Sequence, residues 1–360
     1  MNKYTWTVKA LIRETQDAIS VVFDTGRDAF VYKPGQFINL TVAIDGTPVT
    51  RSYSLSSGPA DAHPAITVKQ VGDGVMSNFL FHHAATVQEW RVEGPFGQFS
   101  LDAAGLPPAA QVVCLGGGSG IAPLFSILKE VAGATLPPPL LLYATREPGQ
   151  VIFGDSLAQM EQDGRLHAFY AFSQANAVAA HPNHLLGRFN TLTIKSIIKR
   201  HCADMANTFF YICGPQELMA VYRSIVLGMG ALEQQVFTED FVPVAPGPEA
   251  ELPDAAFDVL VNYFDTMTIN DVVESCGNTT LVPVAPRQSL LDALHASDMQ
   301  VPHSCKNGTC GSCWARHVSG HVKMINNQAL TKAQVLDEKL ILLCQSYAMN
   351  DEVTIDLAAE

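Results

Sequence analysis

Short runs that alternate hydrophobic and polar residues, separated by glycine and proline, dominate the first hundred positions of the chain. A period of two residues is typical of half-buried β-strands. The runs that follow this pattern are 1–8, 20–23, 36–42, 65–69 and 87–92. Regularly spaced short strands with turn signals between them predict a small antiparallel β-barrel over residues 1–103.

Continuous apolar runs replace this alternation after the prolines at 107 and 108. Residues 111–115 are typical of a buried strand, a glycine cluster follows, and an apolar helix is predicted through 124–128. Further strand-type runs, separated by helical patterns, are 140–143, 167–171 and 208–213. Strands that alternate with helices predict an α/β domain with a parallel sheet, which we assign to residues 104–243.

A stretch rich in proline and acidic residues, 244–255, is typical of a linker. It leads into a third segment, 256–360, which has an apolar strand pattern at 257–261 and a helical pattern at 289–294. A chain of 360 residues is longer than one typical core requires, so two or three domains are expected. The fold class predicted is therefore multi-domain.

Composition and charge restrict the partners of this protein. Hydrophobic residues make up 48% of the chain and the formal net charge is −13, which argues against nucleic acid or an anionic membrane as a partner. The first residues lack an apolar signal region, and no run of 18 apolar residues occurs, so we expect a cytoplasmic protein without a membrane span. From residue 256 onward, twelve acidic side chains outnumber six basic ones. A protein partner of that segment could be locally basic, although an acidic surface also serves solubility.

Four of the eight cysteines have the spacing of a metal centre. The pattern C-x4-C-x2-C is followed by a distant fourth cysteine; these residues are Cys305, Cys310, Cys313 and Cys344. This is the plant-type ligand pattern of a [2Fe–2S] cluster. Gly308 and Gly311 would allow the positive φ angles that the loop needs and leave N–H groups to point at sulfur.

Two other interpretations of these cysteines remain open. A structural zinc site usually has two C-x2-C pairs or a mixture of cysteine and histidine. Disulfides are less expected, because nothing marks the chain as secreted. Of the remaining cysteines, Cys114 lies in an apolar run and is interpreted as a small core residue.

The glycine cluster from 116 to 123 follows a predicted strand and precedes a predicted helix. Small residues at this point let backbone N–H groups approach an anion at the positive end of the helix. The cluster is not the G-x-G-x-x-G dinucleotide fingerprint. It predicts a phosphate-binding turn, and a tight turn without a ligand is the alternative.

Four motifs occur in the order found in the ferredoxin–NADP reductase superfamily: Arg51-Ser-Tyr-Ser-Leu55, Gly74-Val-Met-Ser-Asn-Phe-Leu80, Gly116-Gly-Gly-Ser-Gly-Ile-Ala-Pro123 and Tyr211-Ile-Cys-Gly-Pro215. Together with the C-terminal cysteines, the chain resembles the hybrid reductases that serve bacterial oxygenases. The resemblance implies a flavin-binding β-barrel at 1–103, an NAD(P)H-binding α/β domain at 104–243 and a β-grasp ferredoxin domain at 256–360.

The resemblance also implies a flavin site. Arg51 would pair with the flavin phosphate, Tyr53 would lie against the isoalloxazine, and Ser54 would hydrogen-bond near N5. Ser52 belongs to the same motif. A second phosphate contact is implied at an extended turn formed by Gly74, Val75, Met76 and Ser77, with an ordinary hairpin turn as the alternative. The flavin expected is FAD, and FMN remains possible.

The nicotinamide site is implied in the same way. The residues expected there are Gly117, Gly118, Ser119 and Gly120 at the pyrophosphate, and Cys213, Gly214 and Pro215 near the nicotinamide. Glu239 and Phe241 would close the domain, with Phe241 over the flavin. Ser54, Cys213 and Glu239 form the catalytic group, although Cys213 could also be only a buried thiol.

The nucleotide preference depends on the residues after the strand at 167–171. Many relatives that bind NADPH have Ser-Arg there, where this chain has Ser173-Gln174. We therefore expect NADH, with NADPH possible because Arg146 could compensate.

The function implied is conversion of a two-electron donor into one-electron transfers. NAD(P)H would deliver hydride to the flavin, and the [2Fe–2S] cluster would pass electrons singly to a partner metalloenzyme. An oxygenase or hydroxylase component is the expected acceptor. The alternatives are a hybrid cluster protein or another reductive metalloenzyme as acceptor, or a non-enzymatic redox sensor.

Overall fold

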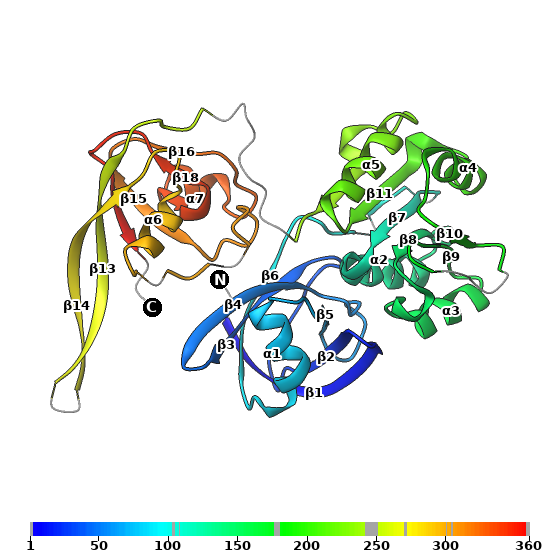
Figure 1. The fold of residues 1–360 in the computed structure, drawn as a ribbon, viewed down its shortest axis with the longest axis horizontal. Helices are drawn as coiled ribbons and strands as arrows, with labels where there is room; N and C mark the ends of the chain where they lie inside the picture. The colour runs from blue at the N-terminus through cyan, green and yellow to red at the C-terminus, as the bar shows by residue number, and fades with distance from the viewer. Residues whose placement is uncertain are drawn as a thin grey trace. The chain divides into compact units, whose positions relative to one another are not determined.

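The computed structural model describes residues 3–102, 105–107, 109–175, 181–241, 251–269, 272–299, 301–303 and 305–357. The chain divides into two compact units, Met1–Phe241 and Val242–Glu360. Figure 1 shows the elements of both. The predicted boundary at 103/104 and the linker positions 244–250 lie outside the described residues.

An antiparallel six-stranded sheet opens the first unit, in the order β4-β3-β6-β1-β2-β5. Its strands are β1 (Lys3–Thr15), β2 (Ala18–Asp24), β3 (Phe37–Ile44), β4 (Thr47–Ser54), β5 (Ala65–Lys69) and β6 (Trp90–Phe96). An isolated antiparallel bridge between Leu55 and Ile66 connects the two edges of the sheet. The sheet is thus curled into the antiparallel barrel that the alternating pattern predicts. Trp6 and Trp90, paired across β1 and β6, are buried in its core.

One element of this barrel domain differs from the expectation. A helix, α1 (Val75–His83), occupies the segment where an extended turn was predicted, and Gly74 is its N-cap. The following strand begins at Trp90 and not at residue 87, because a short 3-10 helix, Ala84–Thr86, intervenes. The hairpin alternative for this segment is therefore wrong.

The second half of this unit is a parallel sheet in the order β10-β9-β8-β7-β11-β12. Its strands are β7 (Gln111–Gly117), β8 (Leu140–Thr145), β9 (His167–Phe172), β10 (His184–Leu186), β11 (Thr208–Cys213) and β12 (Val236–Glu239). The helices are α2 (Ile121–Gly133), α3 (Gly154–Gln162), α4 (Thr191–His201) and α5 (Gln216–Leu227).

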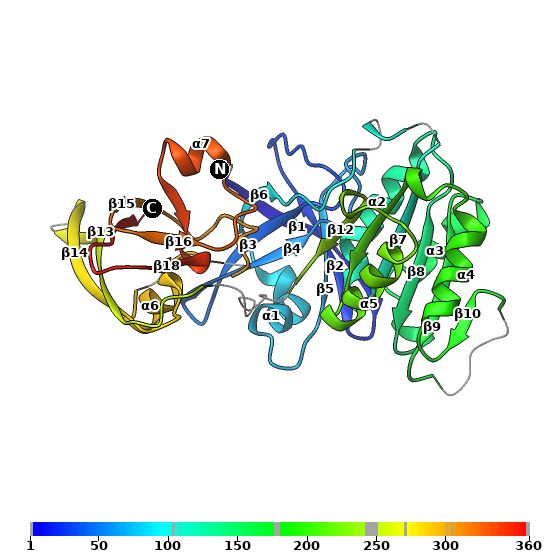
Figure 2. The same cartoon turned by 90° about the horizontal axis from the view of Figure 1, so that it is seen from above.

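Helices cover both faces of the parallel sheet (Figure 2). Side chains of α2 and α3 share one buried cluster with the sheet, and those of α4 and α5 share the other. The strand order reverses between β7 and β11, which are neighbours although β8 to β10 come between them in sequence. Ligands of open α/β sheets bind at such a reversal, beyond the carboxyl ends of the strands. The predicted glycine cluster lies at this point.

The second unit has a five-stranded sheet in the order β14-β13-β19-β15-β17 and a two-stranded sheet, β16-β18. The strands are β13 (Phe257–Ile269), β14 (Val272–Val284), β15 (Trp314–Ser319), β16 (Val322–Met324), β17 (Leu340–Leu342), β18 (Ser346–Ala348) and β19 (Thr354–Leu357). Its helices are α6 (Leu290–Ala296) and α7 (Lys332–Leu336). The apolar face of α6 is buried against the sheet, as in a β-grasp fold.

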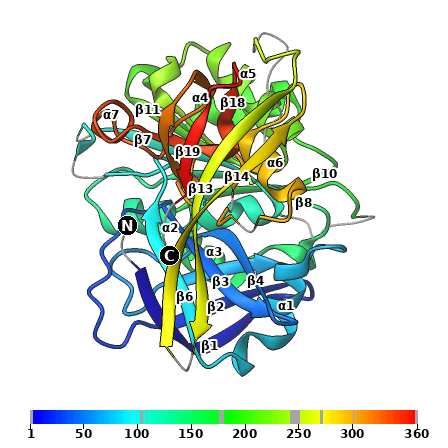
Figure 3. The same cartoon turned by 90° about the vertical axis from the view of Figure 1, so that its left-hand side faces the viewer.

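The hairpin of β13 and β14 extends well beyond the rest of its sheet (Figure 3). The sequence predicted a strand at 257–261 only, whereas β13 continues to Ile269 and pairs with β14 along its whole length. β19 pairs in parallel with positions 260–262 alone, so the outer part of the hairpin has no third strand in the described sheet. Within the described part of the chain, no helix is both long enough and apolar enough to cross a bilayer.

Candidate redox sites

The predicted catalytic residues meet where the barrel joins the parallel sheet. Ser54, the last residue of β4, is buried, and its hydroxyl donates a hydrogen bond of 2.8 Å to Oε2 of Glu239. Glu239 ends β12 and is the register partner of Cys213 at the end of β11. Three residues that are distant in sequence are thereby placed together at the carboxyl edge of the sheet.

The environment of Glu239 raises its pKa to about 8, chiefly because burial disfavours the charged carboxylate. The hydrogen bond from Ser54 lowers the pKa but does not offset the burial. Cys213 is 1% exposed, and burial raises the pKa of its thiol well above the ordinary value. The thiol packs as a core residue, and its burial favours the protonated form.

The other three residues of the Arg-x-Tyr-Ser motif, Arg51, Ser52 and Tyr53, lie on β4 before Ser54 and differ in their surroundings. Arg51 is exposed, and its guanidinium donates to the carbonyl of Thr50 at 2.7 Å. Ser52 donates to Oδ1 of the buried Asn39 at 2.8 Å on the neighbouring strand. Burial raises the pKa of Tyr53, so its phenol remains neutral. An exposed guanidinium next to a partly buried ring suits a ligand that has both a phosphate and an aromatic part.

The N-terminus of α1 supplies a second set of donors. The carbonyl of Gly74 accepts the first hydrogen bond of the helix, from the N–H of Asn78. The N–H groups of residues 75–77 precede this bond and therefore have no partner within the helix. The Ser77 hydroxyl already donates to the carbonyl of Gly74 at 3.1 Å. Met76 is buried in the barrel core, whereas Val75 is 57% exposed. Backbone N–H groups at a helix N-terminus are suited to bind a phosphate. In this structure the Ser77 hydroxyl donates within the helix, so the backbone N–H groups are the donors that face outward from the helix start.

Two turns pack directly on each other at the reversal of the parallel sheet. A Cβ on Gly120 would lie 2.3 Å from the carbonyl oxygen of Cys213, and one on Gly117 would lie 2.9 Å from Cδ of Pro215. Gly214 has a φ of +155° and approaches Gly117 closely. These glycines are therefore required by the contact between the 3-10 turn Gly118–Gly120 and the Cys213–Pro215 turn. The contact brings the backbones of the two turns together at the reversal of the strand order.

The remaining residues predicted at this site have more open surroundings. Gly118 has a φ of +54°, and a Cβ there would meet nothing within 4 Å. Ser119 is half-buried. Phe241 is 48% exposed and is the last residue of its unit, so its predicted contact with a flavin remains a prediction.

The four predicted metal ligands form two pairs. The N–H of Cys305 donates to Sγ of Cys310 at 3.5 Å, and the neighbouring thiol of Cys344 raises the pKa of Cys313. The carbonyl of Cys313 accepts the N–H of Leu343 at 2.9 Å, which brings the 3-10 turn Leu343–Gln345 to the cysteine loop. Among the described residues, no three Cys, His, Asp or Glu side chains converge on a single ion. A single zinc ion needs four converging ligands, whereas each iron of a [2Fe–2S] cluster takes two thiolates, so the pairs fit the cluster.

Backbone donors surround the first cysteine of the loop. The N–H groups of Asn307, Thr309 and Cys310 point at Sγ of Cys305 at 3.3, 3.4 and 3.4 Å. The pKa of Cys305 is lowered to about 5, chiefly by the hydrogen bond with the Cys310 thiol and further by the Thr309 side chain and the N–H groups of Asn307 and Thr309. A thiolate is the form that binds iron. The donor set of the loop therefore fits a [2Fe–2S] cluster.

The glycines of this loop have the conformation that the sequence predicted. Gly308 and Gly311 have φ angles of +75° and +74°. A Cβ on Gly308 would lie 2.8 Å from the carbonyl oxygen of Asn326. Sequence analysis assigned no role to Asn326, which donates to the carbonyl of Asn307 at 2.8 Å, nor to Gln345, which donates to that of Lys306 at 2.9 Å. The position of Gln345 next to Cys344 was the only signal for either residue.

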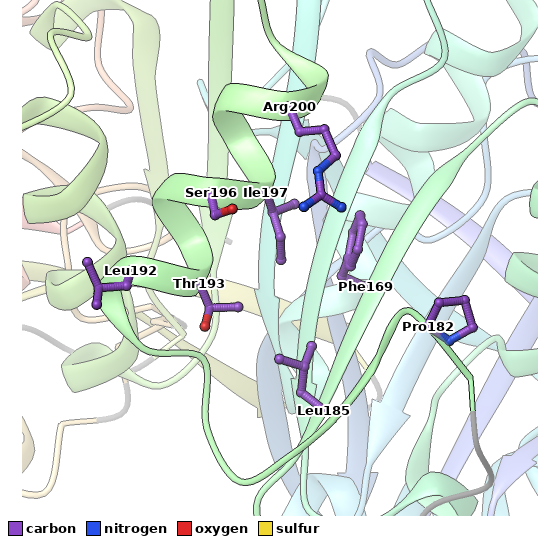
Figure 4. Close-up of a pocket in the computed structure, with 8 residues that line it drawn as sticks. All are labelled: Phe169, Pro182, Leu185, Leu192, Thr193, Ser196, Ile197 and Arg200. Atoms are coloured by element: carbon purple, nitrogen blue, oxygen red, sulfur yellow. The ribbon is translucent and has the colours of Figure 1, made fainter.

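Two hollows in the first unit lie apart from the predicted site residues. One, of about 380 Å³, lies between the β9–β10 edge and α4, where Arg200 and Phe169 stand side by side (Figure 4). The other, of about 660 Å³, separates the barrel from α2 and α3 and is lined by polar side chains such as Glu14 and Ser57. Neither is lined by a residue of the predicted flavin, nicotinamide or cluster sites.

Three protein families match successive parts of the chain. The oxidoreductase FAD-binding domain matches residues 6–101, and the oxidoreductase NAD-binding domain matches residues 114–224. The 2Fe-2S iron-sulfur cluster binding domain matches residues 273–349. Their order agrees with the barrel, the parallel sheet and the cysteine-bearing unit.

Relatives with the same organisation match along nearly their whole length. The ferredoxin reductase component of 3-ketosteroid-9-alpha-monooxygenase from Mycobacterium tuberculosis is 32% identical, with 97% of this chain and 94% of the relative covered. The glycine betaine monooxygenase reductase subunit of Pseudomonas aeruginosa is 27% identical, with 95% and 92% covered.

A solved structure shows the same fold. Phthalate dioxygenase reductase superposes with a TM-score of 0.57 at 22% identity, covering 99% of this chain and 98% of that chain. The fold class predicted from the sequence, with its barrel, α/β and ferredoxin domains, is thereby confirmed. The protein belongs to the same family as the ferredoxin reductase component of 3-ketosteroid-9-alpha-monooxygenase, and is an NAD(P)H oxidoreductase that binds FAD, NAD and a [2Fe–2S] cluster.

Proposed function

We propose that this reductase takes electrons from NADH and delivers them, one at a time, to a terminal oxygenase component. The observation that carries the proposal is the meeting of Ser54, Cys213 and Glu239 at the crevice of a chain that also holds two cysteine pairs. The acceptor is inferred from relatives that are reductase components of monooxygenases. We further propose domains at 1–103, 104–243 and 256–360 with a linker at 244–255.

The cofactors would be held by residues of the first and last domains. Arg51 and the N-terminal N–H groups of α1 would bind the phosphates of FAD, and Tyr53 would pack against its ring. The four cysteines would bind the iron. When bound, FAD accepts two electrons as hydride and the [2Fe–2S] cluster carries one at a time.

The protein's own task in hydride transfer is to orient NADH and exclude water. The backbone N–H groups of the glycine turn, packed against the Cys213–Pro215 turn, would bind the pyrophosphate and direct the nicotinamide toward Ser54. With a pKa of about 8, Glu239 is mostly neutral at pH 7. It would therefore add little negative charge next to the flavin that accepts the electrons. Phe241 would cover the flavin until the nicotinamide displaces it.

The preference for NADH rests on the loops after β8 and β9. The N–H of Gln174 donates to the carbonyl of Arg146 at 2.9 Å, so the two loops lie side by side. Gln174 is exposed and neutral, and it offers no charge to a 2′-phosphate. We also propose a reducing compartment, the cytoplasm, because all seven cysteines whose side chains are described are free of disulfides.

Stopped-flow spectrophotometry with two acceptors tests this proposal. The holoprotein is reduced anaerobically with NADH, or with NADPH in a parallel arm, and mixed with an oxygenase component or a hybrid cluster protein from the same organism. We expect NADH to reduce the protein faster than NADPH, and the oxygenase to reoxidise the cluster within the time of catalytic turnover. Fast reoxidation by the hybrid cluster protein alone would overturn the proposed acceptor.

A further inference from the structure

Tyr143 on β8 hydrogen-bonds to the glycine turn, Gly118–Gly120, that is predicted to bind a phosphate. The side chain of Tyr143 is fully buried, and its hydroxyl donates to the carbonyl of Gly118 at 2.9 Å. Tyr143 is the register partner of Gly116 on β7, and a Cβ on Gly116 would lie 3.6 Å from its Cδ2. Because Gly116 has no side chain, the phenol ring can pass over β7 and reach the turn two residues further along.

Neighbouring side chains leave the Tyr143 ring little freedom. Tyr170, its register partner on β9, lies on the other side with the ring centroids 6.4 Å apart. Both rings belong to the buried cluster that the sheet shares with α2 and α3. Burial raises the pKa of the Tyr143 phenol, so the hydroxyl keeps its proton and acts as the donor to the carbonyl.

The Gly118 carbonyl determines the orientation of the peptide that joins Gly118 to Ser119. This carbonyl accepts the Tyr143 hydroxyl and also the N–H of Ile121, the first residue of α2. The C=O and N–H of a trans peptide point in opposite directions. The N–H of Ser119 therefore points away from the phenol, and it is one of the donors that the start of a helix offers to an anion.

The conformation of Gly118 needs support from outside the turn. Its φ is +54°, and a Cβ there would meet nothing within 4 Å among the described atoms. A glycine-rich segment samples many backbone conformations, and a site that has to become ordered on binding loses affinity. A fixed, buried hydroxyl that hydrogen-bonds to Gly118 would order the turn before NADH binds.

We propose that Tyr143 is a positioning residue for NADH, whose hydroxyl holds the Gly118 carbonyl inward and thereby directs the N–H of Ser119 outward to the pyrophosphate. The inference rests on the proposed reduction of this protein by NADH, and it adds a residue outside the glycine turn to that site. Without the hydroxyl, the Gly118 carbonyl keeps its bond from Ile121. The domain should then stay folded, because no buried acceptor is left unpaired, while the turn loses its fixed orientation.

A pair of buried tyrosines allows a matched test. Tyr143→Phe removes the hydroxyl and keeps the ring. Tyr222→Phe is the control, because Tyr222 on α5 is buried in the cluster on the opposite face of the sheet and its hydroxyl has no hydrogen-bond partner among the described residues. Stopped-flow reduction of the holoproteins at increasing NADH gives the dissociation constant and the limiting rate of hydride transfer. N-benzyl dihydronicotinamide, which has the same reacting ring but no pyrophosphate, is the second donor.

We expect Tyr143→Phe to bind NADH about fivefold more weakly, as the loss of one hydrogen bond implies. Its limiting rate, and its reduction by N-benzyl dihydronicotinamide, should equal those of the wild type. Tyr222→Phe should match the wild type with both donors. Incorporation of para-aminophenylalanine in place of Tyr143, which restores a donor at the same point, should recover most of the affinity.

An unchanged affinity of Tyr143→Phe for NADH would overturn the proposal. An equal loss in Tyr222→Phe, or an equal slowing with both donors, would overturn it too, since either indicates a general effect on packing. If Tyr143→Phe does not retain FAD, para-fluorophenylalanine, which fills the space of the hydroxyl without a donor, takes its place in the same comparison. A wild-type protein that NADH does not reduce would refute the proposed function and this inference together, whereas unchanged affinity in the variant refutes the inference alone.

Discussion

At the scale of single residues, Glu239 has the most unusual chemistry in the flavin–nicotinamide crevice. Glu239 is the last residue of β12, and its carboxyl accepts a hydrogen bond from the hydroxyl of Ser54. Burial raises the pKa of this carboxyl to about 8. A carboxyl whose folded-state pKa exceeds its unfolded value binds protons on folding. It therefore makes the folded state less stable as the pH rises through the interval between the two values.

Glu239→Gln should remove this pH dependence. In the wild type, the contribution of Glu239 to stability is fully present below pH 4.5 and is lost as the pH rises toward about 8. The slope for one proton is at most about 1.4 kcal/mol per pH unit. Denaturant unfolding of the holoproteins at several pH values from 5 to 8 measures both slopes. Parallel slopes for variant and wild type would contradict the assignment.

The cluster ligands were the site residues that the sequence predicted best. The spacing of Cys305, Cys310 and Cys313 indicates the kind of metal centre without any knowledge of the fold. Spacing could not show that they form two pairs with Cys344, since this depends on the turn that brings Leu343 to Cys313. Cys213 shows the opposite limit. Its motif predicted a place at the crevice, but only the packing shows that its thiol is buried and neutral.

At the scale of elements, the contact between the glycine turn and the Cys213–Pro215 turn organises the nucleotide crevice. The glycines were predicted to admit a phosphate, and the structure gives them a second role. Gly117 and Gly120 let β7 and β11, neighbours in the sheet, end in turns that touch backbone to backbone. Sequence could not reveal this role, because the two turns are separated by more than ninety residues.

Gly120→Ala should therefore destabilise this domain. The new Cβ would meet three backbone atoms of Cys213 and Gly214 at 2.6 Å or less, and backbone cannot move aside as a flexible side chain can. We expect a loss of about 1–3 kcal/mol in the free energy of unfolding and weaker NADH binding with FAD retained. Gly133→Ala, at the open end of α2, is the control and should change stability by less than about 1 kcal/mol. Equal effects of the two variants, measured by denaturant unfolding and NADH titration, would refute the contact.

Two elements show where the sequence pattern was insufficient. In α1, the apolar residues Met76 and Leu80 have helical spacing, but Gly72 and Gly74 gave the segment the character of a turn. The helix forms because Met76 and Leu80 are buried against the barrel. The far part of β13 was missed because polar residues such as Asn262 and Asp265 interrupt the apolar run, and pairing with β14 supports it instead.

At the scale of the whole molecule, hydride transfer depends on how the barrel and the parallel sheet are joined within the first unit. Glu14 of β1 accepts the N–H of Phe153, just before α3, at 3.3 Å, and its other oxygen accepts the hydroxyl of Ser20 at 2.6 Å. Phe153 has a φ of +62° and stacks on Phe125 of α2 with centroids 4.1 Å apart. The Glu14 carboxylate thus links strands β1 and β2 of the barrel to Phe153, whose ring packs against α2.

Glu14→Ala should loosen this junction without emptying the flavin site. We expect hydride transfer from NADH, followed by stopped-flow absorbance, to slow severalfold because the reacting atoms are held less closely. Reduction of the same protein by dithionite should be unaffected. Glu89→Ala, which removes an exposed carboxylate before β6, is the control and should behave as the wild type. A Glu14→Ala protein with wild-type hydride transfer would show that this contact does not set the domain geometry.

The central claim is that electrons from NADH reach a [2Fe–2S] cluster held by the four cysteines of this chain. EPR spectroscopy of the purified holoprotein after anaerobic addition of NADH tests it most directly. The account predicts bleaching of the flavin absorbance together with the signal of one reduced [2Fe–2S] cluster, and loss of that signal in Cys344→Ser. An EPR-silent protein after NADH addition, in a sample that contains both flavin and iron, would contradict it.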